Sequence, residues 1–348
     1  MITRNNRGSY FSRFFILGSV FILFFIADLL LGSIIIPAGQ VVSSLFSSAG
    51  AGETFHIIIM DFRLPKALTA VLTGAALSLS GLQMQTVFRN PLAGPYVLGI
   101  SAGASLGVAL FVMGFSTILS TAFISTSGSW SMALVAWAGS FLVLMLVLYV
   151  SVRVKDIMTI LILGILFTSA VTAIVSILQY FSNESLLKAF IIWTMGSLGS
   201  VTWSQLAVLI PAVIAGIFLA FIKIKDLNAF LLGENYARSL GVSVISSRMI
   251  IFLSTSLLAG TITAFCGPIG FIGIAVPHIC RVLFKTADHL VLVPAVLLTG
   301  GIVMLFSDIV SQLPGYQATL PVNSVTALIG IPIIIWMIVK NKKFVSVQ

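Results

Sequence analysis

Long apolar runs recur along the whole chain and are separated by shorter polar segments. The runs lie at 14–36, 64–86, 95–114, 131–152, 157–181, 203–224, 248–267, 269–284, 290–311 and 321–340. A helix needs about 20 apolar residues to cross the ~30 Å hydrocarbon core of a bilayer, and a chain in lipid must satisfy its own backbone hydrogen bonds. The pattern therefore predicts an all-α integral membrane protein with about ten transmembrane helices, organised as a single transmembrane domain over residues 1–348.

The composition excludes a soluble protein. Hydrophobic residues make up 59% of the chain and charged residues only 8%, whereas a soluble domain carries about 25% charged residues. The net charge of +9 does not indicate nucleic-acid binding, because the basic residues lie between the apolar runs and form no patch. The first run is longer than the ~7–15-residue apolar core of a signal peptide, so it predicts a permanent span.

The basic residues also predict the orientation of the chain. Cytoplasmic segments of membrane proteins carry an excess of Lys and Arg. With ten spans and both termini in the cytoplasm, all 18 basic residues except Arg63, Lys66 and Lys188 lie on the inner side. This asymmetry supports a multi-pass topology with both ends inside.

Two polar segments differ from short connections. Segment 37–62 is expected on the outer side and is rich in Ser and Gly, and segment 225–247 is the longest inner stretch. Within the latter, a short helix is predicted to begin at Glu234 and to stop at Gly241, with Arg238 four residues after Glu234. Leu231, Leu232 and Leu240 give this segment apolar side chains with no membrane to enter, which predicts contact with a partner.

Few side chains in the spans carry chemistry. Asp28 and Asp308 are the acids within the runs, and a carboxylate at that depth is a candidate functional group. We expect Asp308 to make structural hydrogen bonds; an ion-coupled secondary carrier that uses Asp308 is the alternative of another class. No metal site is expected, and Cys266 and Cys280 are expected to be buried free thiols.

The segment Gly99-Ile-Ser-Ala-Gly103 has the G-x-S-x-G spacing of a hydrolase nucleophile elbow. That motif requires a strand-to-helix turn, and His278 would be the candidate base of an intramembrane protease. Because Gly99, Gly103 and Gly107 also form the small-residue pattern of closely packed membrane helices, packing is the favoured interpretation. His278 itself is expected to make local hydrogen bonds near Arg281.

No phosphate-binding G-x-x-x-x-G-K-[ST] motif occurs in the chain. If the protein pumps its cargo, ATP hydrolysis takes place on a separate subunit. The chain is therefore expected to be a transport subunit that is not an enzyme and binds no cofactor.

Several motifs in their order along the chain resemble one family. They are Arg63-Leu-Pro-Lys66, Gly74-Ala-Ala-Leu-Ser-Leu-Ser-Gly81, Phe88-Arg-Asn-Pro-Leu-Ala93, Leu98-Gly-Ile-Ser-Ala-Gly103, Leu232-Gly-Glu234, Ala237-Arg-Ser-Leu-Gly-Val242, Gly267-Pro-Ile-Gly-Phe-Ile-Gly273, Val276-Pro-His278 and Val325-Thr-Ala-Leu-Ile-Gly330. On these motifs the chain resembles the FecCD-type permeases of ABC importers over nearly its whole length.

The resemblance implies the type II importer architecture, in a bacterial (inner) membrane. Members form homodimers or pseudo-dimers with a paralogue, and they work with two ATPase subunits and a periplasmic or lipid-anchored substrate-binding protein. The implied function is import of an iron–siderophore-type metal chelate into the cytoplasm, with cobalamin or haem as the alternative cargo.

The resemblance also implies roles for single residues. Arg63 and Lys66 would meet acidic side chains of the binding protein, while Gln312 stands near a position at which the family often has a further basic residue. Residues of a coupling helix would contact the ATPase: Leu232, Gly233, Glu234, Ala237, Arg238, Leu240 and Gly241. The candidates for the pathway or its gate are Asn90, Leu92, Thr168 and Ser169.

Overall fold

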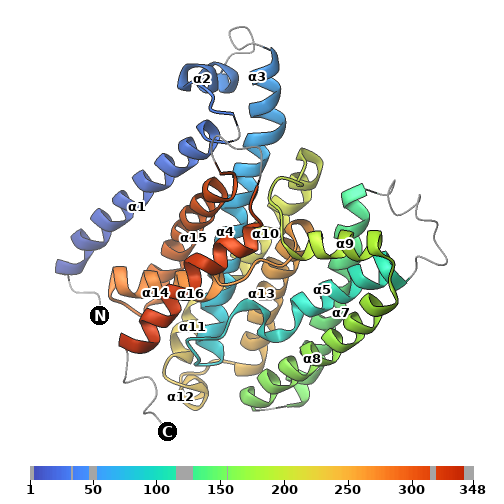
Figure 1. The fold of residues 1–348 in the computed structure, drawn as a ribbon. Helices are drawn as coiled ribbons and strands as arrows, with labels where there is room; N and C mark the ends of the chain where they lie inside the picture. Colours follow the sequence, from blue (N-terminus) through green and yellow to red (C-terminus); the bar gives the residue numbers. More distant parts are fainter. Residues whose placement is uncertain are drawn as a thin grey trace.

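The computed structural model describes residues 4–32, 34–46, 53–114, 128–154, 156–313 and 319–340, and every regular element within them is helical (Figure 1). Eight of the described helices are long and apolar enough to cross a membrane, and two shorter apolar helices lie in the third and eighth predicted runs. The prediction of an all-α membrane protein with about ten transmembrane helices is confirmed. Lys155, Lys342 and Lys343, which contributed to the predicted orientation, lie outside the described residues.

The long helices follow the predicted runs. They are α1 (Arg4–Leu30), α4 (Leu64–Val87), α7 (Gly128–Arg153), α8 (Ile157–Phe181), α10 (Trp203–Ile222), α13 (Val244–Cys266), α15 (His289–Ser311) and α16 (Val322–Lys340). The third run consists of the 3₁₀ turn η2 (Pro95–Leu98), α5 (Ile100–Ala109) and the π-helical turn η3 (Leu110–Gly114), and the eighth is α14 (Ile272–Phe284). The remaining helices are α2 (Ala38–Phe46), α3 (Glu53–Ile57), the π-helical turn η1 (Ile58–Arg63), α9 (Glu184–Thr194), α11 (Ile224–Phe230) and α12 (Glu234–Ser239).

The expectation of a polar loop over 37–62 is wrong for its described part. α3, η1 and α4 form one continuous helix, and its stretch Thr54–Val87 has 34 residues. At 1.5 Å per residue this helix is about 50 Å long, which exceeds the ~30 Å hydrocarbon core. One end of the helix therefore extends beyond the bilayer core, and Arg63 lies within this helix and not in a loop.

Burial separates a core from a periphery. We compared burial in an 18-residue apolar stretch of each spanning helix. In the continuous helix Thr54–Val87, 83% of these residues are buried, and in α13, 78% are buried. The values are much lower for α1 (17%), α8 (22%) and α16 (28%). α4 passes through the centre of the bundle in Figure 1, with α2 and α3 at one end and α11 and α12 at the opposite end. We call these the α3 end and the α12 end.

Glycines bring α4 against its neighbours at backbone contact. A Cβ added at Gly74 would lie 2.0 Å from the carbonyl oxygen of Gly300 in α15, and one added at Gly81 would lie 1.8 Å from that of Gly273 in α14. Real Cβ atoms do not approach backbone so closely, so these seams require glycine. Close approach of this kind is how membrane helices associate without a hydrophobic driving force.

The packing interpretation of the glycine pattern after Leu98 is confirmed. Gly103 of α5 lies against Gly139 of α7, and a Cβ at Gly107 would lie 2.3 Å from the carbonyl oxygen of Val135. Ser101 lies inside α5, which follows a 3₁₀ turn and not a strand. The strand-to-helix geometry of a hydrolase elbow is therefore not present at this serine.

Candidate functional site

The connection between α4 and η2 is a tight turn fixed to α14. Asn90 accepts a hydrogen bond through Oδ1 from the backbone N–H of Leu92 at 2.9 Å, and its own N–H donates to the carbonyl of Gln85 at 3.1 Å. Nε2 of His278 donates to the carbonyl of Pro91 at 2.8 Å. The expectation that His278 makes local hydrogen bonds is confirmed, and its partner holds this turn in place.

The four predicted pathway residues lie on one cavity. Its volume is about 370 Å³, and its walls come from the turn after α4 and from one face of α8. Asn90 and Leu92 line the first wall, and Thr168 and Ser169 line the second. The fold thus brings together two pairs of residues that are far apart in the sequence; their role in transport stays a prediction.

The polar groups of this cavity are largely satisfied within the chain. Oγ1 of Thr168 donates to the carbonyl of Gly164 at 2.9 Å, and Oγ of Ser169 donates to that of Ile165 at 3.0 Å. No charged side chain is among the residues that line this cavity. Such a wall offers a solute few free hydrogen-bonding groups and no ion pair.

The predicted short helix in segment 225–247 is α12. Gly241 adopts φ +82° and ends the helix, with the N–H of Gly241 donating to the carbonyl of Arg238 and that of Val242 to the carbonyl of Ala237. This pair of bonds is a Schellman motif, which favours glycine because the position is left-handed. The predicted stop at Gly241 is confirmed.

α12 is anchored at its first residue and buried on one side. The carboxylate of Glu234 pairs with the guanidinium of Arg248 in α13, so its partner in the structure is not Arg238 four residues later. Ala237 is fully buried and Gly233 adopts φ +103°. These three predicted coupling residues hold the segment in place; Gly233 and Ala237 are buried, and the Glu234 side chain is 24% exposed.

The outer face of the same segment is apolar. Leu232, Tyr236 and Leu240 are spaced four residues apart and are 62%, 51% and 59% exposed. Tyr236 lies in α12, Leu232 lies in the turn before it, and Leu240 is the residue that ends it. Tyr236 was missed by the sequence analysis, although its spacing from the two leucines was a usable signal.

The structure gives both predicted docking cations partners inside the chain. The guanidinium of Arg63 donates to the carbonyls of Leu29 at 2.7 Å, of Leu30 at 3.0 Å and of Ile34, and the residue is only 9% exposed. Nζ of Lys66 lies 3.0 Å from Oδ1 of Asp308. The docking role stays a prediction, and reversing both charges would also break these contacts.

Asp308 belongs to a network between helices. Nε2 of Gln312 donates to Oδ2 of Asp308 at 2.8 Å and to Oδ1 of Asp28 at 3.3 Å. Both carboxylates are buried, so the expected structural hydrogen-bonding role of Asp308 has a geometric basis. The network joins α1, α4 and α15 at the α3 end, and Asp308 does not line the cavity described above.

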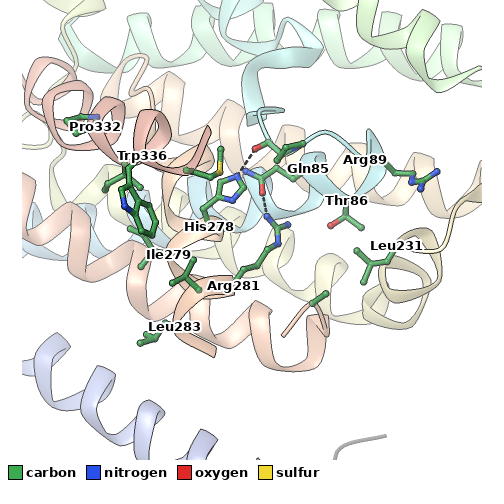
Figure 2. A pocket seen from close by; sticks show the side chains of 15 residues that line it. Gln85, Thr86, Arg89, Leu231, His278, Ile279, Arg281, Leu283, Pro332 and Trp336 are labelled. Carbon is green, nitrogen blue, oxygen red and sulfur yellow. Dashed lines mark hydrogen bonds between the residues drawn. The ribbon is translucent and has the colours of Figure 1, made fainter. Parts of the chain in front are cut away.

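A larger cavity lies at the α12 end, and the sequence analysis did not predict it. Its volume is about 990 Å³, and it is bounded by the end of α4, by α14, by α16 and by Leu231 after α11 (Figure 2). Nη1 of Arg281 donates to Oε1 of Gln85 at 2.5 Å within it. No run of apolar residues could have indicated this cavity, because its walls come from four segments that are far apart in the sequence.

The cysteines and metal-binding side chains add no further site. Cys266 and Cys280 are buried free thiols, as expected. Among the described residues, no group of three or more His, Cys, Asp or Glu side chains is placed to hold a metal ion.

Comparisons with known proteins agree with this architecture. The chain matches the model of the FecCD transport family over residues 20–340. It is 35% identical to the "Vitamin B12 import system permease protein BtuC" of Salmonella paratyphi A (strain ATCC 9150 / SARB42) and to that of Salmonella typhi, in each case over 293 residues that cover 84% of this chain and 86% of the relative.

Two solved structures are similar to this fold. An inward-facing metal-chelate type ABC transporter superposes with a TM-score of 0.80 at 29% identity and covers 94% of this chain and 98% of its own. PsaBC from Streptococcus pneumoniae in complex with Fab superposes with a TM-score of 0.54 at 15% identity, covering 87% and 95%, which shows a likeness of fold alone.

The buried helical core, the exposed apolar spans and the glycine seams define a multi-pass membrane protein. The chain belongs to the FecCD transport family and is a permease of the ABC importer class.

Proposed function

We propose that this chain passes a metal chelate from an external binding protein to the cytoplasm, with energy supplied by ATPase subunits that contact the α12 segment. The cavity between the turn after α4 and α8 carries this proposal. Its walls are uncharged and its hydroxyls are bonded to their own helix, so a large solute would meet a passage without a tight site. A transport pathway requires such weak binding, because a tight site would retain the cargo.

The proposed cargo rests on the sequence motifs and on the relatives. An iron–siderophore-type chelate is the first expectation from the sequence, and the 35% identity to vitamin B12 permeases favours cobalamin as its main competitor, with haem as a third candidate. Uptake of labelled cobalamin, ferric siderophore and haem, measured in a strain that lacks its own permeases for them, discriminates among the three.

The proposed assembly has two permease copies, two ATPases and one binding protein, in the bacterial inner membrane with both termini cytoplasmic. The exposed face of Leu232, Tyr236 and Leu240 suits the ATPase contact, since an apolar patch beyond the membrane spans is stabilised by a partner. Arg63 and Lys66 are proposed to guide the binding protein through acidic side chains at the α3 end, and charge complementarity of this kind mainly fixes register.

Filling the cavity tests the pathway. Thr168→Trp places a large side chain in the cavity and should abolish uptake in proteoliposomes that contain the complete transporter, while ATP hydrolysis by the assembled complex continues. The matched control is Ile162→Trp, which changes a 54% exposed residue of the same helix that does not line the cavity. Normal uptake by the Thr168 variant would reject the assigned pathway.

Replacing the exposed leucines on either side of α12 tests the coupling. Leu232→Asp with Leu240→Asp should release the ATPase in a pull-down, whereas Ser239→Asp in the same segment should not. Uptake driven by a proton or sodium gradient without ATP would favour the secondary carrier instead.

A further inference from the structure

The cavity at the α12 end has an unbalanced charge. Its lining includes Arg89 and Arg281 and no Asp or Glu side chain. Asp288, which follows the lining residue Ala287, accepts hydrogen bonds from the N–H of Leu290 and from Asn228, so its carboxylate is occupied elsewhere. The guanidinium of Arg89 is directed away from Arg281 (Figure 2) and lies beside Gly233, so Arg281 supplies the cationic donors of this cavity. A guanidinium in a cavity lined by no carboxylate is a candidate for binding an anion.

Arg281 is the centre of this imbalance. Figure 2 shows its guanidinium directed at the side-chain amide of Gln85, which is neutral. A guanidinium carries five N–H donors, and among the described residues the hydrogen bond found for this one is to Oε1 of Gln85. The remaining donors are available to an acceptor that enters the cavity. Phosphate oxygens suit them, because Arg binds phosphate through two parallel hydrogen bonds.

One wall of the cavity is apolar. Pro332, Ile333, Trp336 and Met337 line it from α16, and Ile279, Val282 and Leu283 line it from α14. α16 is long and apolar enough to cross a membrane, and α14 is a shorter apolar helix. The site therefore combines cationic donors at one side with a hydrocarbon-like wall at the other, which is the division found in a phospholipid. A tryptophan near the bilayer surface is typical of the same depth.

We propose that this cavity binds an anionic phospholipid, with its phosphate at Arg281 and its acyl chains along α14 and α16. Basic cavities between membrane helices are known sites for anionic headgroups. The apolar wall favours a lipid over an acidic side chain of a protein partner, because a carboxylate on a soluble subunit would leave the seven apolar side chains without a matching surface. The same wall favours a lipid over a free phosphate ion.

The experiment uses the purified full-length permease in a mild detergent. Native mass spectrometry compares retention of phosphatidylglycerol and phosphatidylcholine with identical acyl chains. Wild-type protein should retain phosphatidylglycerol preferentially, and Arg281→Gln should weaken that retention by at least about tenfold, as expected for losing charged hydrogen bonds to phosphate. Arg281→Lys should retain part of the preference because it keeps the charge.

Lys285→Gln is the matched control. It removes a cation from the end of the same helix, next to but outside the cavity lining, and should leave the preference unchanged. Thermal melts of all variants show that they are folded. Equal retention of the two lipids by wild-type protein would overturn the proposal.

Two other outcomes would also overturn it. Displacement of phosphatidylglycerol by glycerol phosphate at similar concentration would mean that the site binds the free anion. Loss of the lipid on adding the ATPase subunit, with a new cross-link from Arg281→Cys to that subunit, would mean that the cavity is a protein contact.

Discussion

The cationic side chains near the two ends of α4 have different kinds of partner. At the α3 end, Arg63 and Lys66 meet backbone carbonyls and the carboxylate of Asp308. At the α12 end, Arg248 is paired with Glu234, but Arg281 donates to the neutral amide of Gln85 in a cavity lined by no acid. The charges at the α3 end are matched within the chain, whereas Arg281 is left for the anion proposed above. Charge balance thus separates a region that fixes the helices from a region that is prepared for a ligand.

The largest expected effect comes from preventing the close packing of α4, which joins these regions, against α15. Gly74→Ala would place a methyl group 2.0 Å from the carbonyl oxygen of Gly300, and neither backbone can yield. We expect a loss of more than about 4 kcal/mol, seen as absence of folded protein after purification. Gly18→Ala in α1 is the control, since nothing lies within 4 Å of that site, and it should fold normally.

The next effect tests the balanced end. Asp308→Ala leaves Lys66, whose side chain is only 21% exposed, without its carboxylate and removes an acceptor of Gln312, so it should cost about 3 kcal/mol. Denaturation in SDS measures the loss. The double variant Lys66→Met with Asp308→Leu should be more stable than Asp308→Ala alone; if it is less stable, the pair is not the cause.

A smaller effect on stability is expected from Asp156, an exposed carboxylate that belongs neither to the network at the α3 end nor to the cavity at the α12 end. Asp156 caps α8 by accepting hydrogen bonds from the backbone N–H groups of Thr159 and Met158, and the hydroxyl of Thr159 also donates to it. These bonds, with the Thr159 side chain contributing most, lower the pKa of Asp156. A lowered folded-state pKa means that the stabilisation is complete above the unfolded-state value near 3.8 and is lost as the pH falls through the folded-state value.

Melting temperatures of wild type and Asp156→Asn between pH 7 and pH 3 check this. Asparagine is also a good N-cap, so the variant should cap α8 about as well as wild type at pH 7. Because asparagine does not titrate, the variant should lack the fall in melting temperature that protonation of Asp156 causes in wild type. Identical pH dependence of the two proteins would contradict the assignment.

The smallest effect sharpens the contrast between the two ends. Arg281→Gln in a zwitterionic detergent should change stability by no more than about 1 kcal/mol, because this guanidinium has no ion pair to lose. A loss as large as that of Asp308→Ala would mean that the charge of Arg281 is also matched within the chain. Melts of the two variants in the same detergent make the comparison.

The sequence by itself determined the properties that depend on local composition. Hydropathy gave the spans, because crossing lipid requires a long apolar helix wherever it occurs in the chain. Gly241 marked the end of α12, because a left-handed position favours glycine irrespective of the fold. The glycine pattern after Leu98 likewise predicted a close contact between helices, which the structure contains.

Only the tertiary structure decided which distant groups meet. The pairing of Lys66 with Asp308, of Glu234 with Arg248 and of Gln85 with Arg281 joins residues that no local pattern relates. The continuation of α4 outward through η1 and α3 was also decided there, since Arg63 in mid-helix finds its partners on α1 and the residues after it. Pairing energies depend on separation in space, and that separation is set by the packing of all the helices together.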